Sequence, residues 1–365
     1  MAVAAWHSSA MEDPTEALAD RLFRDALGAL ELFAVYLGER LGLYRALHEG
    51  GPATSGELAG RTGTAERYVR EWLEHHAASG LLEVDHPAAD PRQRRFRLPS
   101  GHVPVLADGD DVRFGTLRAI DIARAARQLP DLVDAFRTGG APPPLPWAPE
   151  GRAAENRTLY LSCLGRQWLP AIADIDRRLR AEPPARVADV ACGMGWSSIA
   201  IALAYPLVTV AGFDLDPEAI ADARRNAAAE RVAHRVSFSV ADAADPGLSG
   251  GFDLVTILEG FHDLARPVDT LRTARELLAR GGSVFMIDER VADEFTAPAS
   301  EMERYHYGWS LMSCLPGAMG DPQTAATGAV LRTGTLRRYA EEAGFRGVEV
   351  LPIETPAWRF YRLYP

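Results

Sequence analysis

The residues best suited to chemistry are two glycines, an aspartate and a histidine, each of which follows an apolar run. Gly193 and Gly195 come after the run 187–191 and precede a segment of small helix-forming residues. Glycines in such a turn let a ligand approach free backbone N–H groups at a helix N-terminus. Asp214 ends the next apolar run, 19 residues after Gly195, near the spacing at which a carboxylate binds ribose hydroxyls. Together these residues predict a nucleoside site.

The histidine is His262, which follows the apolar segment 251–260. We expect that segment to be a strand, and ligands of open α/β sheets bind at the carboxyl ends of the strands. An imidazole titrates near neutral pH and can accept a proton from a phenol or another hydroxyl. His262 is therefore a candidate general base. The alternative is that it only caps the helix that follows.

The glycine turn lacks the features of two common nucleotide sites. The third glycine position of the dinucleotide fingerprint holds Ser198, and no Gly-Lys-Ser or Gly-Lys-Thr follows the turn. The chain contains no lysine, so its 39 basic residues are all arginines. A P-loop lysine, a Schiff-base lysine and a kinase-type lysine are thus excluded.

The order of these features resembles the S-adenosylmethionine (SAM) site of class I methyltransferases. The resemblance is carried by Asp189, by the two glycines, by Asp214 and, after a third strand, by Val240-Ala-Asp242. It implies that these positions surround the methionine moiety, the ribose and the adenine of SAM, and that S-adenosylhomocysteine (SAH) is the product. The implied donor contacts are Asp189, Gly193, Gly195, Asp214, Leu215, Asp242, Ala243 and Glu259.

The segment Phe261-His262-Asp263 resembles the catalytic segment of small-molecule O-methyltransferases. The resemblance implies that His262 is the general base and that an acidic residue of the fifth strand frames it. Counting along that strand indicates Asp288. Because Glu289 lies on the opposite face of the strand, a register error of one residue would exchange the two. Family members often carry tryptophan after the His-Asp pair, where this chain has Leu264.

The N-terminal third predicts helices. Apolar residues recur at helical spacing through 16–47, which indicates two helices. The segment 54–82 then predicts a helix, a turn and a second helix, with Ser55 and Thr64 as N-caps.

Two short strands, at 81–85 and 95–98, complete a winged-helix pattern, which is typical of DNA-binding regulators. The second helix carries Glu66, Glu71 and Glu74 against two arginines, whereas a helix between phosphates should be clearly basic. We therefore expect no nucleic-acid partner. The resemblance to small-molecule O-methyltransferases implies instead that this domain forms a homodimer and covers the substrate pocket.

Length, charge and cysteine content narrow the remaining classes. A chain of 365 residues allows about two domains, and we expect a winged-helix domain at 1–110, linking helices with a proline-rich connector at 111–180, and a SAM-binding domain at 181–365. A net charge of −11 disfavours nucleic acid and anionic membranes. No membrane span and no signal peptide are apparent, so a cytoplasmic protein is expected. The three cysteines show no metal-type spacing, and no metal is expected.

The predicted fold is α/β, a Rossmann-like class I methyltransferase sheet with an antiparallel terminal hairpin, plus the mainly α winged-helix domain. The hairpin is expected from strands at 347–353 and 358–364. The insertion 297–330 follows the fifth strand, where a lid would lie. Aromatic runs at helical spacing are usually core or interface, but substrate contact is also expected here. The candidate contacts are Trp168, Tyr305, His306, Trp309 and Met312.

Three classes of function remain open. The first is SAM-dependent O-methylation of a small, aromatic or phenolic metabolite, with His262 as the base. The second is C- or N-methylation on the same scaffold, because a base that deprotonates a phenol also activates the neighbouring ring carbon. The third is a SAM-sensing regulator that binds DNA through the winged helix.

Overall fold

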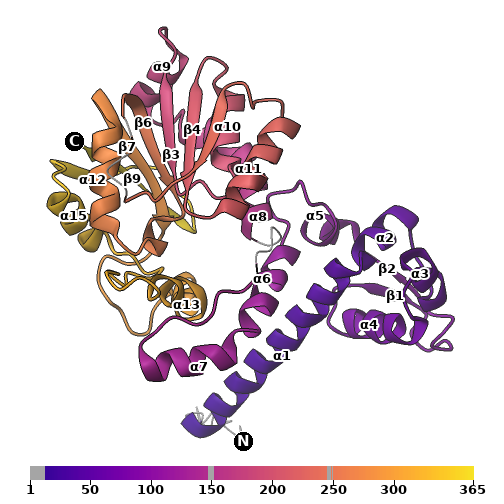
Figure 1. The fold of residues 1–365 in the computed structure, drawn as a ribbon. Helices are drawn as coiled ribbons and strands as arrows, with labels where there is room; N and C mark the ends of the chain where they lie inside the picture. Colours follow the sequence, from indigo (N-terminus) through magenta and orange to yellow (C-terminus); the bar gives the residue numbers. More distant parts are fainter. Residues whose placement is uncertain (1–12, 147–151, 245–247, 249) are drawn as a thin grey trace, which may run out of the picture. The chain divides into compact units, whose positions relative to one another are not determined.

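The computed structural model describes residues 13–146, 152–244, 248 and 250–365. The chain forms two compact units, Met1–Ala123 and Arg124–Pro365, each with a hydrophobic core of its own (Figure 1). Within the described residues, no helix combines the length and the apolar character that crossing a bilayer requires.

The first unit is mainly helical and contains a two-stranded antiparallel wing. Its elements are α1 (Pro14–Arg40), α2 (Leu43–Gly50), α3 (Ser55–Thr62), α4 (Glu66–Ala78), β1 (Glu83–Asp85), β2 (Arg95–Arg97), η1 (Ser100–His102), α5 (Val103–Leu106) and α6 (Thr116–Ala126), which crosses into the second unit. The two helices expected in 16–47 are present. They are separated at Gly42, whose φ of 65° lies in the left-handed region.

Both predicted N-caps of the helix-turn-helix were wrong. Thr54 caps α3 through a capping box with Glu57, in which each side chain accepts the other residue's backbone N–H. The Ser55 hydroxyl instead donates to Glu66, at 2.6 Å. Thr64 lies one residue too early, since α4 begins after Ala65.

The second unit is built on a seven-stranded sheet of order β5-β4-β3-β6-β7-β9-β8. The strands are β3 (Arg186–Val190), β4 (Thr209–Asp214), β5 (Val236–Val240), β6 (Phe252–Leu258), β7 (Leu278–Glu289), β8 (Gly347–Val350) and β9 (Trp358–Tyr364). The first five in this order pair in parallel, while β9 is antiparallel to both neighbours. The predicted sheet with its antiparallel terminal hairpin is confirmed.

Helices cover both faces of this sheet, so each face carries its own core (Figure 1). The helices of this unit are α7 (Leu129–Thr138), α8 (Arg152–Leu159), the π-helix η2 (Tyr160–Trp168), α9 (Ala173–Arg180), α10 (Trp196–Ala204), α11 (Pro217–Ala229), η3 (Phe261–Asp263), α12 (Pro267–Leu277), α13 (Glu301–Trp309), the π-helix η4 (Ser310–Cys314), α14 (Leu315–Ala318) and α15 (Thr333–Glu342), and only some of them pack on the sheet. Parallel strands flanked in this way bring their carboxyl ends to one edge, where the candidate site lies.

Prolines divide the linking helices expected at 111–180. The stretch 111–136 contains α6 and the start of α7, with Pro130 in the first turn of α7. The stretch 153–180 is divided after η2, next to Pro170. A proline lacks the N–H that a continuing helix needs, and its ring clashes with the preceding turn. The proline-rich connector begins at residue 141. Residues 141–146 are irregular, and residues 147–151 lie outside the described residues.

Helix α1 leaves much of its apolar surface exposed. Leu22, Phe23 and Leu30 retain 61%, 70% and 63% of their accessible surface. A row of large apolar side chains along one helix is typical of a surface that another protein covers. This observation favours the homodimer that the sequence analysis expects.

We expect the double variant Leu22→Glu/Phe23→Glu to shift the protein from dimer to monomer, because charges would be buried on association. Light scattering at micromolar concentration should give twice the chain mass of 39.6 kDa for the unmodified protein and one chain mass for the variant. The control is Arg24→Glu, at an exposed position of the same helix, which should remain dimeric. An unmodified protein of single-chain mass would contradict the prediction.

Candidate functional site

The glycine turn between β3 and α10 has the backbone conformation that the sequence suggested. Gly193 and Gly195 have φ values of 51° and 77°, which side chains other than glycine rarely adopt. A Cβ on Gly195 would lie 2.5 Å from the ring of Phe238, so this position also has no room for a side chain. Gly195 is the residue immediately before α10, and the turn therefore presents backbone to a ligand at a helix N-terminus.

Asp189 lies beneath this turn and is almost completely buried. Its Oδ2 accepts hydrogen bonds from Ser197 and Ser198, both at 2.6 Å, and its Oδ1 accepts one from Thr256 at 2.7 Å. Burial raises the pKa of this carboxyl, and the three hydroxyl donors oppose that shift. The side chain thus ties α10 and β6 to the turn. The structure does not bring it to the cavity, where the resemblance implied a donor contact.

A cavity of about 580 Å³ opens at the carboxyl ends of the parallel strands. This volume is in the range of sites for small molecules and cofactors. Four predicted donor contacts line it, namely Asp214, Leu215, Asp242 and Ala243. Asp263, Arg266, Thr270 and five residues of 317–322 also line it, and none of them was expected as a donor contact. Glu259 is buried at the end of β6, outside this lining, with a φ of 57°.

Asp214 connects the cavity to the glycine turn. Its Oδ2 accepts the N–H of Gly193 at 2.8 Å, and its Oδ1 accepts that of Asp216 at 2.9 Å. Burial raises the pKa of this carboxyl, and the two backbone donors work in the opposite direction. Each carboxylate oxygen can accept a second hydrogen bond, so Asp214 keeps acceptor capacity for ribose hydroxyls.

Asp242 is held by Arg266. One of its oxygens accepts the N–H of Ala244 at 2.9 Å, and the other pairs with the Arg266 guanidinium. The same guanidinium lies 3.5 Å from Asp321, in the insertion. A ligand that hydrogen-bonds to Asp242 would therefore share this carboxylate with the side chain of Arg266. Nothing in the local sequence marks Arg266, because it is brought to Asp242 only by the tertiary fold.

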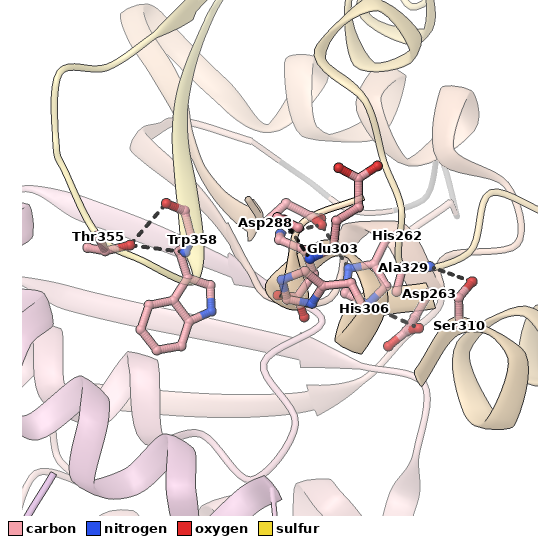
Figure 2. Close-up of polar contacts among 11 residues, drawn as sticks. His262, Asp263, Asp288, Glu303, His306, Ser310, Ala329, Thr355 and Trp358 are labelled. Atoms are coloured by element: carbon pink, nitrogen blue, oxygen red, sulfur yellow. Dashed lines mark hydrogen bonds and ion pairs between the residues drawn. The ribbon is translucent and has the colours of Figure 1, made fainter. Parts of the chain in front are cut away.

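The catalytic candidates His262 and Asp288 form a fully buried pair (Figure 2). Nδ1 of His262 lies 2.9 Å from Oδ1 of Asp288, which also accepts the N–H of Glu289. Burial by itself would lower the pKa of His262, but the carboxylates of Asp288 and Asp263 favour the imidazolium and raise that pKa well above its ordinary value. The geometry resolves the register question in favour of Asp288.

Glu289 pairs with a second histidine. Its carboxylate lies 3.2 Å from Nδ1 of His306 in α13. Both residues of this second pair are buried. Two histidine–carboxylate pairs thus occupy adjacent positions at the end of β7, on opposite faces of the strand. Figure 2 shows His262, Asp288 and His306 close together.

The other candidate substrate contacts differ in their surroundings. Trp168 is buried against Trp358 and Phe360, with ring centroids 5.9 and 5.2 Å away, and belongs to the core. Tyr305 is exposed and lies edge-on to the half-buried Trp309. Met312 is half-buried in η4. None of these four residues lines the cavity, so substrate contact by Tyr305, Trp309 and Met312 stays a prediction.

Two protein families match the chain, one in each part. Residues 182–344 match the family described as a methyltransferase domain, and residues 17–107 match the Rv2258c-like winged HTH domain. The first match contains the glycine turn, the cavity-lining residues and the His262–Asp288 pair. The second contains the helix-turn-helix and the wing.

The curated relatives match only part of the chain. Tocopherol O-methyltransferase, chloroplastic, of Arabidopsis thaliana is 34% identical over 103 residues, which are 28% of this chain and 29% of that protein. The chain spans between 29% and 56% of the length of the first curated relatives that it matches.

Two solved structures cover almost the whole chain. Mitomycin 7-O-methyltransferase MmcR aligns with a TM-score of 0.70 at 22% identity, over 96% of this chain and 98% of its own. Human N-acetylserotonin methyltransferase in complex with SAM aligns with a TM-score of 0.69 at 18% identity, over 98% and 99%. At these identities the likeness shows the fold, and it confirms the predicted class I methyltransferase sheet with an N-terminal winged-helix domain.

We expect Asp214→Ala to weaken SAH binding by about 1.5–3 kcal/mol, because hydrogen bonds to a charged acceptor contribute on that order. Isothermal calorimetry should show a Kd that is roughly 10- to 150-fold higher. Asp214→Asn keeps the size of the side chain and one acceptor oxygen. Its Kd should therefore fall between those of the unmodified protein and Asp214→Ala. Equal affinity in all three, on folded protein, would remove Asp214 from the donor site.

Proposed function

We propose that this chain, which carries a class I SAM-dependent methyltransferase domain behind a winged helix-turn-helix domain, methylates a hydroxyl group of a small aromatic or phenolic metabolite. The observation that supports this most is the buried His262–Asp288 pair, next to Asp263 in the wall of the donor cavity. A nucleoside-sized cavity beside an oriented imidazole combines the two requirements of the reaction, a bound donor and a base.

The donor supplies an electrophilic methyl group on a sulfonium, so the protein has to align the acceptor and remove one proton. An acceptor oxygen attacks the methyl carbon, the carbon–sulfur bond breaks, and its electron pair stays on sulfur. The hydroxyl proton passes to Nε2 of His262. Asp288 holds the N–H of the opposite ring nitrogen, which fixes the tautomer and stabilises the imidazolium that forms. No step of this scheme uses a metal ion.

Access to the base requires movement of the chain. His262 has no exposed surface, and it lies near Cys314 at the end of η4, in the insertion. We infer that part of 297–330 moves aside when the acceptor enters and excludes water when it returns. Tyr305, Trp309 and Met312 belong to this segment and are the proposed acceptor contacts.

The rival DNA-binding function is disfavoured by the charges of α4. Glu71 pairs with Arg67 at 2.6 Å, Glu66 with Arg70 at 3.3 Å, and Glu74 with Arg94 at 2.6 Å. These pairs neutralise the arginines that would have to contact phosphates. The proposed partners are therefore a small-molecule substrate and a second copy of the chain, without nucleic acid or membrane, in the cytoplasm.

Methyl transfer from labelled SAM to components of a cell extract tests the proposed reaction. Chemical analysis of the labelled product separates O-, N- and C-methylation, since the base alone does not determine which atom is attacked. A gel-shift assay with genomic fragments tests the regulator. Binding of DNA without any labelled product would favour that regulator over the enzyme.

We expect His262→Ala to lower kcat by about 10²- to 10⁴-fold, the usual contribution of general base catalysis, and to leave the Kd for SAH nearly unchanged. The control is His234→Ala, an exposed histidine whose loss should leave kcat unaltered. EDTA should not change turnover of the unmodified enzyme. Full activity of His262→Ala at neutral pH would reduce the histidine to a structural role.

We expect turnover to rise with pH through an inflection above 6.5, the ordinary pKa of an imidazole. Activity requires the neutral form of His262. The neighbouring carboxylates raise the pKa of His262, so as the pH falls the histidine becomes protonated, and activity is lost, at a higher pH than for a free imidazole. Asp288→Asn removes one of those charges, and the inflection should move to lower pH. An unchanged pH profile in this variant would show that Asp288 does not act on the base.

A further inference from the structure

A histidine, a carboxylate and a thiol converge beside the donor cavity. The ligand atoms of His262, Asp263 and Cys314 all lie within 4.8 Å of one another. Nε2 of His262 is 3.4 Å from Oδ1 of Asp263, and the completely buried imidazole also interacts with the side chain of Cys314. This nitrogen therefore points its lone pair or its proton into the cluster.

We propose that His262, Asp263 and Cys314 bind a thiophilic divalent cation of the Zn²⁺ type, and that the bound ion switches the site off. One nitrogen, one sulfur and one carboxylate oxygen are ligands that Zn²⁺ takes in tetrahedral sites, with the fourth position left to water. A thiolate ligand selects such ions over Mg²⁺, which prefers oxygen.

The surroundings of His262 are those of a metal ligand as well as of a base. Histidines that bind metals usually donate the N–H of the other ring nitrogen to a carboxylate, and Nδ1 of His262 lies 2.9 Å from Asp288. In the neutral imidazole, a proton on Nδ1 leaves Nε2 as the nitrogen with a free lone pair. The same interaction thus prepares the imidazole for either role.

Only small adjustments would close the site. Bond lengths of 2.0–2.3 Å to zinc place tetrahedral ligand atoms roughly 3.3–3.8 Å apart, compared with the 4.8 Å limit observed. The side chain of Asp263 is 49% exposed and lines the cavity, so it can rotate and gives the ion a path from solvent.

Binding would release the thiol proton of Cys314 to solvent and involve no change of oxidation state. The ion would occupy the lone pair of Nε2 that otherwise accepts the substrate proton, and turnover would stop. This inhibition rests on the proposed function of His262. The binding itself does not, and it can be measured separately.

The experiment uses Co²⁺ as a spectroscopic probe on the whole, reduced protein. We expect a thiolate-to-cobalt charge-transfer band that saturates at one ion per chain, disappears in Cys314→Ser and is displaced by Zn²⁺. The matched control is Cys163→Ser, because Cys163 is also a free, half-buried cysteine of the second unit and should leave the band intact. Zn²⁺, but not Mg²⁺, should protect Cys314 from alkylation by iodoacetamide, as read by peptide mass spectrometry.

In the methyl-transfer assay, the Zn²⁺ concentration for half-inhibition should rise at least roughly 10- to 100-fold in Cys314→Ser relative to Cys163→Ser. A missing band in the unmodified protein, a band that persists in Cys314→Ser, or equal zinc inhibition of the two serine variants would overturn the proposal. A band with the expected dependence on Cys314 would support the site even if no methyl transfer were found, and that result would count against the proposed function alone.

Discussion

Buried carboxylates at the ends of strands must be compensated by donors, and the architecture of the catalytic unit depends on how this is done. An unpaired charge in the interior costs several kcal/mol, so each buried acid fixes the groups that surround it. Asp189 is the central case. Its three hydroxyl partners come from α10 and β6, and the glycine turn lies directly above it. The position of the turn, and with it the donor cavity, follows from this one carboxylate.

The same constraint explains the end of β7. Asp288 and Glu289 point to opposite faces of the strand, and each has a histidine partner from a different element. Asp288 lies against His262 of η3, whereas Glu289 lies against His306 of α13. The insertion is thereby connected to β7 by a histidine–carboxylate contact that does not involve His262. Movement of the insertion to admit an acceptor would then have to preserve or break the His306–Glu289 contact.

Much of this site could be predicted from the sequence, because its main determinants are local. A glycine turn after a buried strand, Asp214 at a fixed distance, and His262 after another strand are all patterns within short segments. The pairing of His262 with Asp288 needed only the strand register. The capping of α3 by Thr54 rather than Ser55 is also encoded locally, because Thr54 and Glu57 have the spacing of a capping box.

Other features could not be predicted from the sequence, because they depend on partners that only the tertiary fold brings together. Ser198 occupied the place of a missing glycine, and only the fold shows that its hydroxyl satisfies Asp189. Arg266 reaches Asp242 across 24 residues of chain. Trp168 belongs to an aromatic cluster with residues of β9, far along the sequence. Tertiary partners of this kind determine whether a side chain packs in the core or contacts a ligand.

The buried His262–Asp288 pair also bears on where the transferable proton lies, on the acceptor hydroxyl or on the imidazole. The carboxylates of Asp288 and Asp263 raise the pKa of His262 and so favour its imidazolium form. A phenol that meets neutral imidazole and a phenolate that meets imidazolium carry the same number of protons, so the two descriptions are states of one coupled pair. An acidic phenol would therefore enter as its anion and be attracted by the imidazolium, while a weakly acidic one would depend on His262 as the base. The acidity of the acceptor, rather than the geometry of the dyad, decides which description applies.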